Sequence, residues 1–271
     1  MRADLHVHST HSDGSDGPER IAELAAGAGV SFMSLTDHDT ASSQRPMAEA
    51  ARNAGVGYIN GIEVSAWDGA SGRKAHILGY GYTKAKILID FCDSVISQRR
   101  ASGLAMVAKV ASLGYAITEG EVLAHTHDGV IYRQHIGRAL CEKGYADKVM
   151  GGLFRFLFGP GGPVRGGNRY PSAVEAVKAI REAGGVAVLA HPADYGNLGS
   201  VAALAKEGLG GLEAAHPRHT PKEAREAAEI AAAHGLFVTG GTDYHGAYGD
   251  PQMGIGGCGA PICPALAEML T

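Results

Sequence analysis

Two histidines near the start of the chain are separated by one residue, in the segment Asp4-Leu5-His6-Val7-His8. Side chains two residues apart on a β-strand leave the same face, so His6 and His8 could hold one metal ion together. A lone pair of this kind can also be accidental or face solvent. The interpretation as a metal site therefore depends on further ligands elsewhere in the chain.

Further side chains of metal-ligand type lie at the ends of apolar, strand-like runs or within them. In an α/β barrel the carboxyl ends of the strands meet at one face, where active sites form. Independent accidents do not explain the same feature at successive runs, so the pattern predicts one metal centre. The residues concerned are Asp13, Asp37, His38, Asp39, Glu63, His76, His191, Asp243 and His245.

Some of these residues have ordinary structural alternatives. Asp13 could stabilise its turn, and Asp37 or Asp39 could cap a helix. His76 could be a hydrogen-bonded core histidine, but Glu63 and His191 would then be further buried polar groups that need partners. The remaining histidines match no such pattern and are expected at the surface or in packing, with a role for His216 left open. They are His11, His125, His127, His216 and His234.

Seven short apolar runs alternate with amphipathic segments, which is typical of an α/β domain. Pro18 and Pro221 stand at plausible helix starts, and Gly29 and Gly55 at plausible helix ends. The pattern favours a barrel with mostly parallel strands over an open sheet, without deciding whether the barrel closes. The expected strands are Ala3 to Val7, Phe32 to Thr36, Val56 to Ile62, His76 to Tyr80, Gly185 to Ala190, Leu209 to Ala214 and Leu236 to Thr239.

The segment from Lys84 to Asn168 interrupts this alternation. Helical patterns cover Ile87 to Leu113 and Ile131 to Lys143, and a run rich in glycine and proline follows at 159–167. We expect residues 84–168 to form a mostly helical insertion. It would cap a catalytic barrel made of residues 1–83 and 169–271.

The composition limits the class of protein. With 271 residues and 45% hydrophobic content, the chain can bury a large core. A net charge of -4 gives no global positive field for a stable long nucleic-acid partner. No membrane segment or export signal is evident, so we expect a soluble, cytoplasmic protein. The four cysteines are expected to be reduced structural thiols: Cys92, Cys141, Cys258 and Cys263.

Taken together, the motifs resemble those of the polymerase and histidinol phosphatase (PHP) family. The resemblance runs in order from residue 4 to residue 245. It implies a distorted seven-stranded (β/α) barrel related to the amidohydrolases, in agreement with the strand pattern. The matching motifs are Asp4-x-His6-x-His8, Ser12-Asp13-Gly14, Thr36-Asp37-His38-Asp39, Glu63-x-Ser65, His76, Ala190-His191-Pro192 and Gly241-Thr242-Asp243-Tyr244-His245.

The resemblance implies two or three divalent metal ions. One ion would be held by His6, His8, Glu63 and Asp243. A second would be held by Glu63 as a bridge with His76 and His191, and a third by Asp13, His38 and His245. These ligands are all nitrogen and oxygen donors, which favours manganese, with iron or zinc as alternatives.

The insertion resembles that of the small phosphoesterases of the family. In that branch an Arg-x-His on an insertion helix contacts the substrate phosphate, and Arg133-Gln134-His135 occupies the matching place here. Guanidinium groups bind phosphate through paired donors, although a solvated helix face is the alternative explanation. Arg218 and His219 are similarly placed after the sixth strand. An expected cation near Gly161-Gly162-Pro163 is not evident, although Arg165 and Arg169 lie close by.

The resemblance implies a metal-dependent phosphoesterase that uses a metal-bound hydroxide. Glu63 and Asp243 would position that hydroxide, and His219 would protonate the leaving oxygen. We expect a small nucleotide or sugar phosphate as substrate, such as a nucleoside 3′,5′-bisphosphate or a 5′-phosphorylated short oligonucleotide. The alternatives are a cyclic phosphodiesterase that opens a five-membered cyclic phosphate and an amidohydrolase that acts on a carbon centre. No protein partner is implied.

Overall fold

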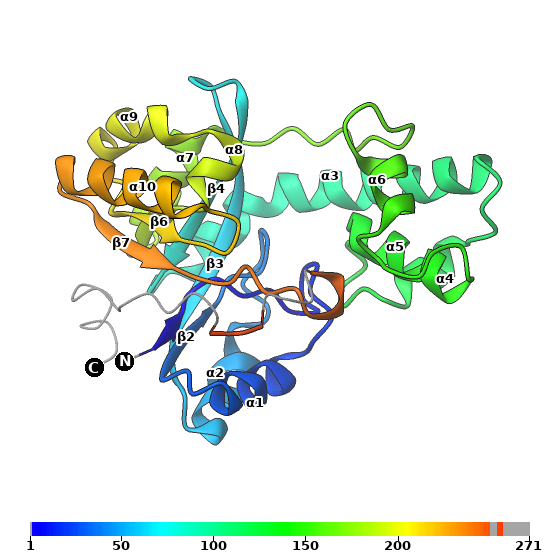
Figure 1. Ribbon diagram of the computed structural model, residues 1–271, viewed down its shortest axis with the longest axis horizontal. Helices are drawn as coiled ribbons and strands as arrows, with labels where there is room; N and C mark the ends of the chain where they lie inside the picture. Colours follow the sequence, from blue (N-terminus) through cyan, green and yellow to red (C-terminus); the bar gives the residue numbers. More distant parts are fainter. Residues whose placement is uncertain (1, 250–253, 257–271) are drawn as a thin grey trace.

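The computed structural model describes residues 2–249 and 254–256 (Figure 1). Seven strands form one sheet, in the order in which they occur along the chain. All seven predicted strands are present, although the first ends at Asp4 instead of Val7 and the third continues beyond Ile62 to Asp68. They are β1 (Ala3–Asp4), β2 (Phe32–Leu35), β3 (Gly57–Asp68), β4 (Arg73–Tyr80), β5 (Val186–Leu189), β6 (Gly211–Ala215) and β7 (Phe237–Gly240).

The strand directions are mixed around β4. Strands β1 to β3 are parallel to one another, as are β5 to β7, whereas β4 is antiparallel to both of its neighbours. The connection between Asp68 and Arg73 explains this reversal, because it is too short for the crossover that a parallel pair requires. The expectation of mostly parallel strands therefore holds for the sheet outside this hairpin.

Backbone hydrogen bonds join the two edges of the sheet. The N–H of Leu5 donates to the carbonyl oxygen of Gly240 at 3.2 Å, and the N–H of Asp243 donates to that of His6 at 2.8 Å. The N–H of His8 donates to the carbonyl oxygen of Tyr244 at 2.9 Å. The segment after β1 thus runs beside the segment after β7. The sheet is a nearly closed barrel, which confirms the predicted fold class.

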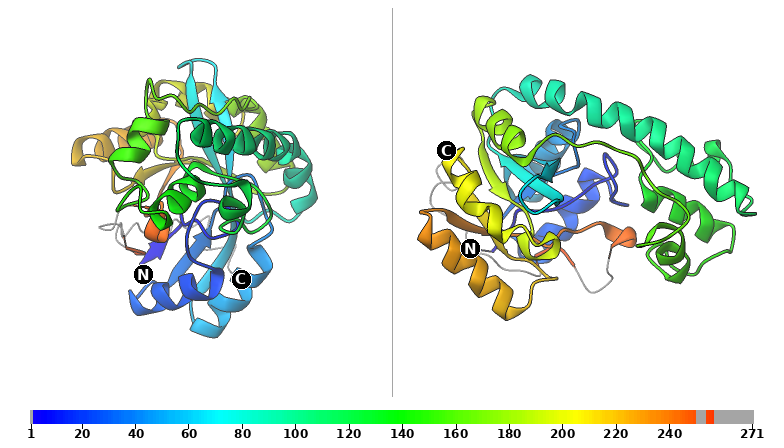
Figure 2. Two further views of the ribbon diagram at one scale, coloured as in Figure 1. Left: turned by 90° about the vertical axis from the view of Figure 1, so that its right-hand side faces the viewer. Right: turned by 90° about the horizontal axis from the view of Figure 1, so that it is seen from above.

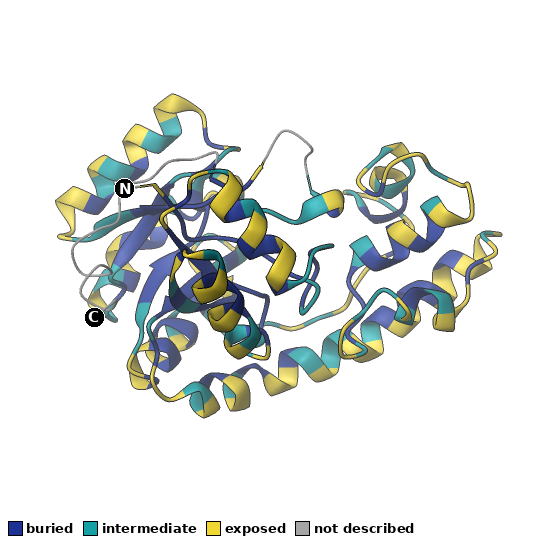
Figure 3. Cartoon of the chain, turned by 90° about the horizontal axis from the view of Figure 1, so that it is seen from below, coloured by how far each residue is buried: buried dark blue, intermediate teal, exposed yellow. Residues whose placement is uncertain are grey.

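Helices cover the outside of this barrel (Figures 1 and 3). Pro18 begins the first helix and left-handed Gly55 ends the second, as expected. Their buried sides pack on the strands, because Ile21 and Met47 share one apolar cluster with Met33 and Leu35. The helices outside the insertion are α1 (Pro18–Gly27), α2 (Gln44–Ala54), α7 (Ala173–Glu182), α8 (Pro192–Tyr195), η1 (Leu198–Ser200), α9 (Val201–Lys206), α10 (Pro221–Ala233) and η2 (Gly246–Tyr248).

Four further helices, which we call the helical lobe, project from one side of the barrel (Figures 1 and 2). Near its start α3 packs Leu88 into the barrel core, and near its end it packs Val110 into a separate apolar cluster with Ile136 and Leu157. This second cluster indicates a unit with its own core, and the division at residues 84 and 168 stays a prediction. The lobe consists of α3 (Ala85–Ser112), α4 (Glu119–Leu123), α5 (Arg133–Glu142) and α6 (Gly152–Phe158).

Two expectations from the composition concern membrane-spanning helices and cysteine thiols. Within the described ranges, no helix combines the length and apolar character needed to cross a membrane. Cys92 is buried and Cys141 is half-buried, and both are free thiols. Cys258 and Cys263 lie outside the described residues.

Candidate metal centre

The carboxylate of Glu63, on β3, is the centre of a cluster of histidines. It is buried, and both of its oxygens face imidazole nitrogens supplied by other strands and loops. The distances to Glu63 are 3.3 Å from Nε2 of His6, 3.1 Å from Nε2 of His8, 3.0 Å from Nδ1 of His38, 2.8 Å from Nδ1 of His76 and 3.1 Å from Nε2 of His191. The structure thus brings together residues from five separate segments of the sequence.

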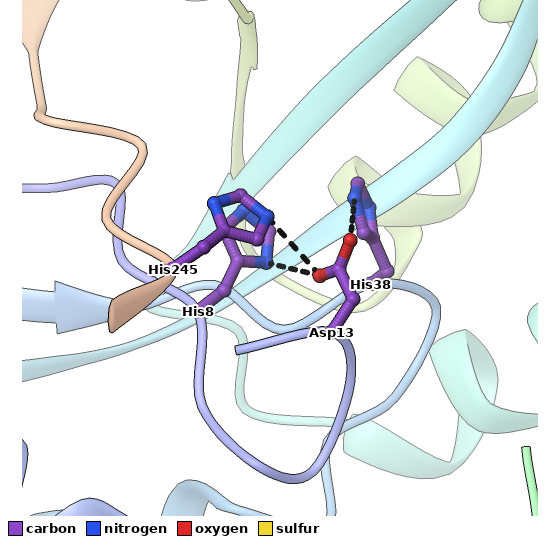
Figure 4. A group of neighbouring side chains, drawn as sticks. All are labelled: His8, Asp13, His38 and His245. Carbon is purple, nitrogen blue, oxygen red and sulfur yellow. Dashed lines mark ion pairs between the residues drawn. The ribbon is translucent and has the colours of Figure 1, made fainter. Parts of the chain in front are cut away.

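Two aspartates extend the cluster on either side. Oδ1 of Asp243 lies 3.5 Å from Nε2 of His6 and 3.2 Å from Nε2 of His8. Asp13 lies between His8 and His245 on one side and His38 on the other (Figure 4). Its Oδ1 is 3.2 Å from Nε2 of His245. All nine ligands that the family resemblance implies therefore belong to one connected cluster, although the assignment of each to an ion stays a prediction.

Within the cluster, overlapping groups have ligand atoms close enough to share an ion. In each group the atoms lie within 4.8 Å of one another. One of these groups contains all three residues of the predicted third site together with His8. The groups are His8, Asp13, His38 and His245; His6, His8 and Asp243; His6, Glu63 and His191; and His38, Glu63 and His76.

Several buried polar atoms of the cluster lack hydrogen-bond partners within the described part of the chain and are suited to bind metal ions. Among the described residues, Nε2 of His6 and His8, Nδ1 of His38 and His76, and Oε2 of Glu63 have no hydrogen-bond partner. Buried polar atoms normally have partners, because leaving them unsatisfied costs free energy. The donors are nitrogen and oxygen only, which suits divalent manganese, iron or zinc.

The charges of the cluster are strongly coupled. Burial would raise the pKa of Glu63 and of Asp243, but the surrounding imidazoles hold both values well below the ordinary range. Burial would lower the pKa of His8, yet the nearby carboxylates of Asp243 and Glu63 raise it to about 10. For His38, burial prevails over Glu63 and lowers the pKa to about 3. The carboxylates are therefore ionised, and bound metal ions would take the place of histidine protons.

Glu213 on β6 contacts two of the predicted metal ligands, His6 and His191. It was not among the predicted site residues. It is buried, and its oxygens lie 3.0 and 3.1 Å from Nδ1 of His6. It also accepts a hydrogen bond from the backbone N–H of His191 at 2.9 Å. A carboxylate on one ring nitrogen fixes the orientation of a histidine ligand and leaves the other nitrogen for the metal. The sequence signal was a single carboxylate inside an apolar strand.

The backbone at several strand ends adopts a conformation that favours glycine. Asp39, His191 and Asp243 have φ angles of 57°, 26° and 52°. Residues other than glycine enter this region at a cost, and they do so preferentially at functional sites. Two of these three residues are predicted metal ligands, and the third directly follows His38.

His216 lies in the centre rather than at the surface. It is buried, and its Nδ1 accepts a hydrogen bond from the backbone N–H of Arg218 at 3.3 Å. Its Nε2 lies 3.6 Å from Oδ2 of Asp243. Sequence reasoning left its role open because its position beside Asp243 depends on how β6 and β7 are paired.

Arg218 and His219 lie at the edge of the cluster, as expected from their position after β6. The guanidinium group of Arg218 contacts Asp243 and, at 2.8 Å, Asp194. His219 is buried, and its Nδ1 donates to the carbonyl oxygen of Ala214 at 3.0 Å, which leaves Nε2 without a partner among the described residues.

Among the described residues, Arg133 and His135, the predicted phosphate contacts of the lobe, have hydrogen-bond partners within the lobe and not in the metal-ligand cluster. His135 is buried, and its Nδ1 accepts the backbone N–H of Tyr132 at 3.2 Å. Arg133 is half-buried and donates to the carbonyl oxygen of Phe158 at 3.5 Å. The residue between them, Gln134, instead reaches the cluster and donates to Oδ2 of Asp13 at 2.7 Å. Contact of Arg133 and His135 with a substrate stays a prediction.

A cavity of about 1210 Å³ separates the metal-ligand cluster from the lobe. Glu63, His76 and Asp243 line it on the barrel side, as does Arg218, which contacts Asp243. The lobe contributes further cations, and Arg133 and His135 are not among the described residues that line the cavity. These lobe cations are Arg138, Lys148 and Arg155. The cavity thus joins a cluster of metal-binding type to a basic wall.

Several known proteins are similar to this chain in sequence or fold. A phosphoribosyl 1,2-cyclic phosphate 1,2-diphosphodiesterase of Eggerthella lenta is 39% identical over 94% of this chain and 98% of its own length. A 3′,5′-nucleoside bisphosphate phosphatase of Chromobacterium violaceum is 32% identical over 89% of this chain and 86% of its own. The structure of a candidate metal-dependent phosphoesterase from Bifidobacterium adolescentis superposes with a TM-score of 0.87 at 27% identity, over 99% of this chain and 94% of that one.

The PHP domain family matches residues 4–187, which is more than half of the chain. This range includes six of the nine predicted metal ligands, and the other three, His191, Asp243 and His245, follow it. The resemblance noted in the sequence is therefore confirmed. Together with the relatives above, the match shows that the chain belongs to the PHP domain family of metal-dependent phosphoesterases.

Proposed function

We propose that the protein hydrolyses a phosphate ester of a ribose that carries a second phosphate group. The observation that carries this proposal is the buried cluster around Glu63, which opens into a cavity with Arg218 at its edge and cations on its far wall. A scissile phosphate would lie at the cluster, and a second phosphate would lie toward the lobe.

The chain offers ligands for two or three divalent ions, with manganese favoured over iron or zinc. His6, His8, Glu63 and Asp243 would hold the first ion. Glu63 would bridge to a second with His76 and His191, and Asp13, His38 and His245 would hold a third. When bound, such ions supply Lewis-acid activation of a water and neutralise charge on phosphoryl oxygens.

The residues around the ligands would bind and orient the substrate. Arg218 carries paired guanidinium donors at the edge of the cluster, a geometry that suits phosphate. His219 is oriented by its bond to Ala214, and its buried Nε2 has no partner among the described residues, so we propose it as the group that exchanges a proton with the leaving oxygen. In His135, Nδ1 accepts a bond, so a neutral ring carries its proton on the buried Nε2, and contact of this atom with a phosphate oxygen stays a prediction.

The first candidate substrate is a cyclic phosphodiester of a phosphorylated ribose. The relative that is 39% identical over nearly the full chain is named for phosphoribosyl 1,2-cyclic phosphate. The second candidate is a nucleoside 3′,5′-bisphosphate, for which the relative at 32% identity is named. Both substrates have two phosphate groups on one ribose, which suits cations at opposite ends of the cavity.

A carbon-centred amidohydrolase reaction would use similar ligands but would give no role to the lobe cations. The cavity wall formed by Arg138, Lys148 and Arg155 therefore favours phosphoester hydrolysis. A cytoplasmic location and the lack of a long nucleic-acid or protein partner stay predictions.

The test is a substrate panel on manganese-loaded protein. It contains phosphoribosyl 1,2-cyclic phosphate, adenosine 3′,5′-bisphosphate, 2′,3′-cyclic AMP, a 5′-phosphorylated short oligonucleotide and an amide substrate, with products resolved by chromatography. We expect turnover of a doubly phosphorylated ribose, and the preferred compound decides between the two candidates. Turnover of the amide alone would contradict the proposal.

A further inference from the structure

An arginine of the helical lobe is buried against the barrel beside the predicted metal ligands. Arg99 lies in the middle of α3, and its side chain is 12% exposed. Its Nε and one terminal nitrogen donate to Oδ2 of Asp39 at 3.2 and 2.9 Å. The same terminal nitrogen donates to Oγ of Ser65 at 2.7 Å. A single buried cation thus holds two separate segments of the barrel.

These two segments carry predicted ligands. Asp39 follows His38, and Ser65 is two residues beyond Glu63. The N–H of Asp39 donates to the carbonyl oxygen of Glu63 at 2.9 Å, and the N–H of Ser65 donates to Oδ1 of Asp39 at 2.7 Å. Asp39 therefore ties the segment of His38 to the strand of Glu63, and Arg99 balances the charge of its buried carboxylate.

The backbone of Asp39 makes this support more important. Its φ angle of 57° lies in the left-handed region, which an aspartate occupies at a cost in free energy that surrounding contacts offset. The surroundings are the hydrogen bonds to Glu63 and Ser65 and the ion pair with Arg99. Loss of the ion pair would remove one of the contacts that hold this conformation.

Aromatic contacts connect Arg99 to a second link between lobe and barrel. Its guanidinium group lies 4.9 Å from the ring centroid of Tyr132 and 5.7 Å from that of Tyr170, within the range of cation–π contacts. The hydroxyl of Tyr132 donates to the carbonyl oxygen of His38 at 3.3 Å. Tyr132 also precedes α5, from which Gln134 reaches Asp13. The contacts of Tyr132 and Gln134 therefore end on the backbone of one predicted metal ligand, His38, and on the side chain of another, Asp13.

We propose that Arg99 is a positioning residue through which the helical lobe sets the geometry of the metal ligands. The inference rests on the proposed ligand assignment. Arg99 acts through Asp39 and Ser65 on His38 and Glu63, without touching an ion or the substrate. Without it, the Asp39 carboxylate loses its counter-charge, and the His38 segment is free to move relative to Glu63.

The test compares manganese binding to metal-stripped proteins by titration calorimetry. Arg99→Met removes the charge at similar length, and Arg99→Lys keeps the charge but loses the fork of donors. We expect Arg99→Met to weaken manganese binding at one site or more by about 10- to 100-fold, the usual effect of losing a group that orients metal ligands. Arg99→Lys should lose less. The matched control is Arg100→Met, which changes the exposed neighbouring residue of the same helix.

A rescue variant separates positioning from general stability. In the double variant Asp39→Asn with Arg99→Met, the neutral amide needs no counter-charge and still accepts from Ser65, so part of the manganese affinity should return. A merely structural role would lower the melting temperature of Arg99→Met and leave the manganese affinity of the folded protein unchanged. If Arg99→Met does not fold, the same titration is made on Arg99→Gln together with Arg99→Lys, and wild-type manganese affinity in both variants overturns the inference.

Glu63→Gln distinguishes the two ways in which the inference can fail. Unchanged affinity in Arg99→Met, together with loss of a site in Glu63→Gln, would overturn the role of Arg99 alone. Unchanged affinity in both variants would overturn the ligand assignment on which that role rests.

Discussion

The two ends of the cavity hold their charges in different ways. At the barrel end, carboxylates and imidazoles are buried in mutual contact, as around Glu63 and Asp243. At the lobe end, Arg138 is 44% exposed and pairs with Glu142 on its own helix, and Arg155 is also exposed. Buried, interlocked ligands keep a fixed geometry, whereas exposed cations can adapt to different anions. We infer that the barrel supplies the chemistry and the lobe supplies the preference for a substrate.

Among the effects that would distinguish the buried charges of the barrel end from the exposed charges of the lobe end, we expect the pH dependence of metal binding to be the largest. The pKa of His8 is raised from its ordinary value of 6.5 to about 10, so its proton must leave when a metal binds. Release of one proton makes the affinity rise about tenfold per pH unit, or roughly 100-fold from pH 6 to pH 8. Calorimetry in buffers of different ionisation enthalpy measures the protons released.

In the metal-stripped protein, the raised pKa of His8 makes stability fall as the pH rises, whereas metal affinity increases with pH. A raised histidine pKa contributes stability that is fully present below pH 6.5 and is lost as the pH rises through about 10. The lowered carboxylate pKa values contribute stability above their ordinary range, and this part is lost as the pH falls. Manganese affinity that is independent of pH, with no proton release, would contradict the charge coupling described for the barrel end.

The next largest effect is expected from Glu213, the carboxylate that contacts Nδ1 of the predicted ligand His6. Glu213→Gln removes the charge that orients His6 while keeping the shape of the side chain. We expect manganese affinity to fall about 10- to 100-fold. The matched control is Glu226→Gln on the exposed side of α10, which should leave affinity unchanged. Equal affinity in the two variants would show that His6 does not depend on Glu213.

Much of the barrel end could be predicted because its ligands follow strands that the apolar pattern reveals, or lie within them as Glu63 and His76 do. His6, Glu63 and His191 stand in short motifs, and any barrel of these strands brings them to one face. Glu213 and Arg99 could not be predicted in the same way. Their partners lie far away in the sequence, and an isolated carboxylate in a strand or arginine in a helix has many ordinary uses.

The lobe was less predictable for a related physical reason. Its helical patterns were visible, and α3 and α5 match them within a few residues. The resemblance pointed to Arg133 and His135, yet Gln134 is the residue of this turn that reaches the cluster. Which face of a short helix meets a neighbouring barrel depends on packing, and three consecutive polar residues do not reveal it.

The smallest expected effect lies at the lobe end. Arg155→Ala should raise the KM for a doubly phosphorylated ribose about tenfold, equivalent to one lost phosphate contact, with little change in kcat. The KM for a ribose with a single phosphate should not change. Steady-state kinetics with the two substrates measures this difference. A fall in kcat without a change in KM would break the proposed division between chemistry and preference.

The most direct test of the central claim is Glu63→Gln, assayed for metal content and turnover in parallel with the wild-type protein. Because Glu63 is the hub of the cluster, we predict loss of at least one bound ion and a fall in kcat of roughly 10³-fold, with the fold retained by circular dichroism. A folded Glu63→Gln protein with full metal content and full activity would contradict the proposed metal centre around Glu63.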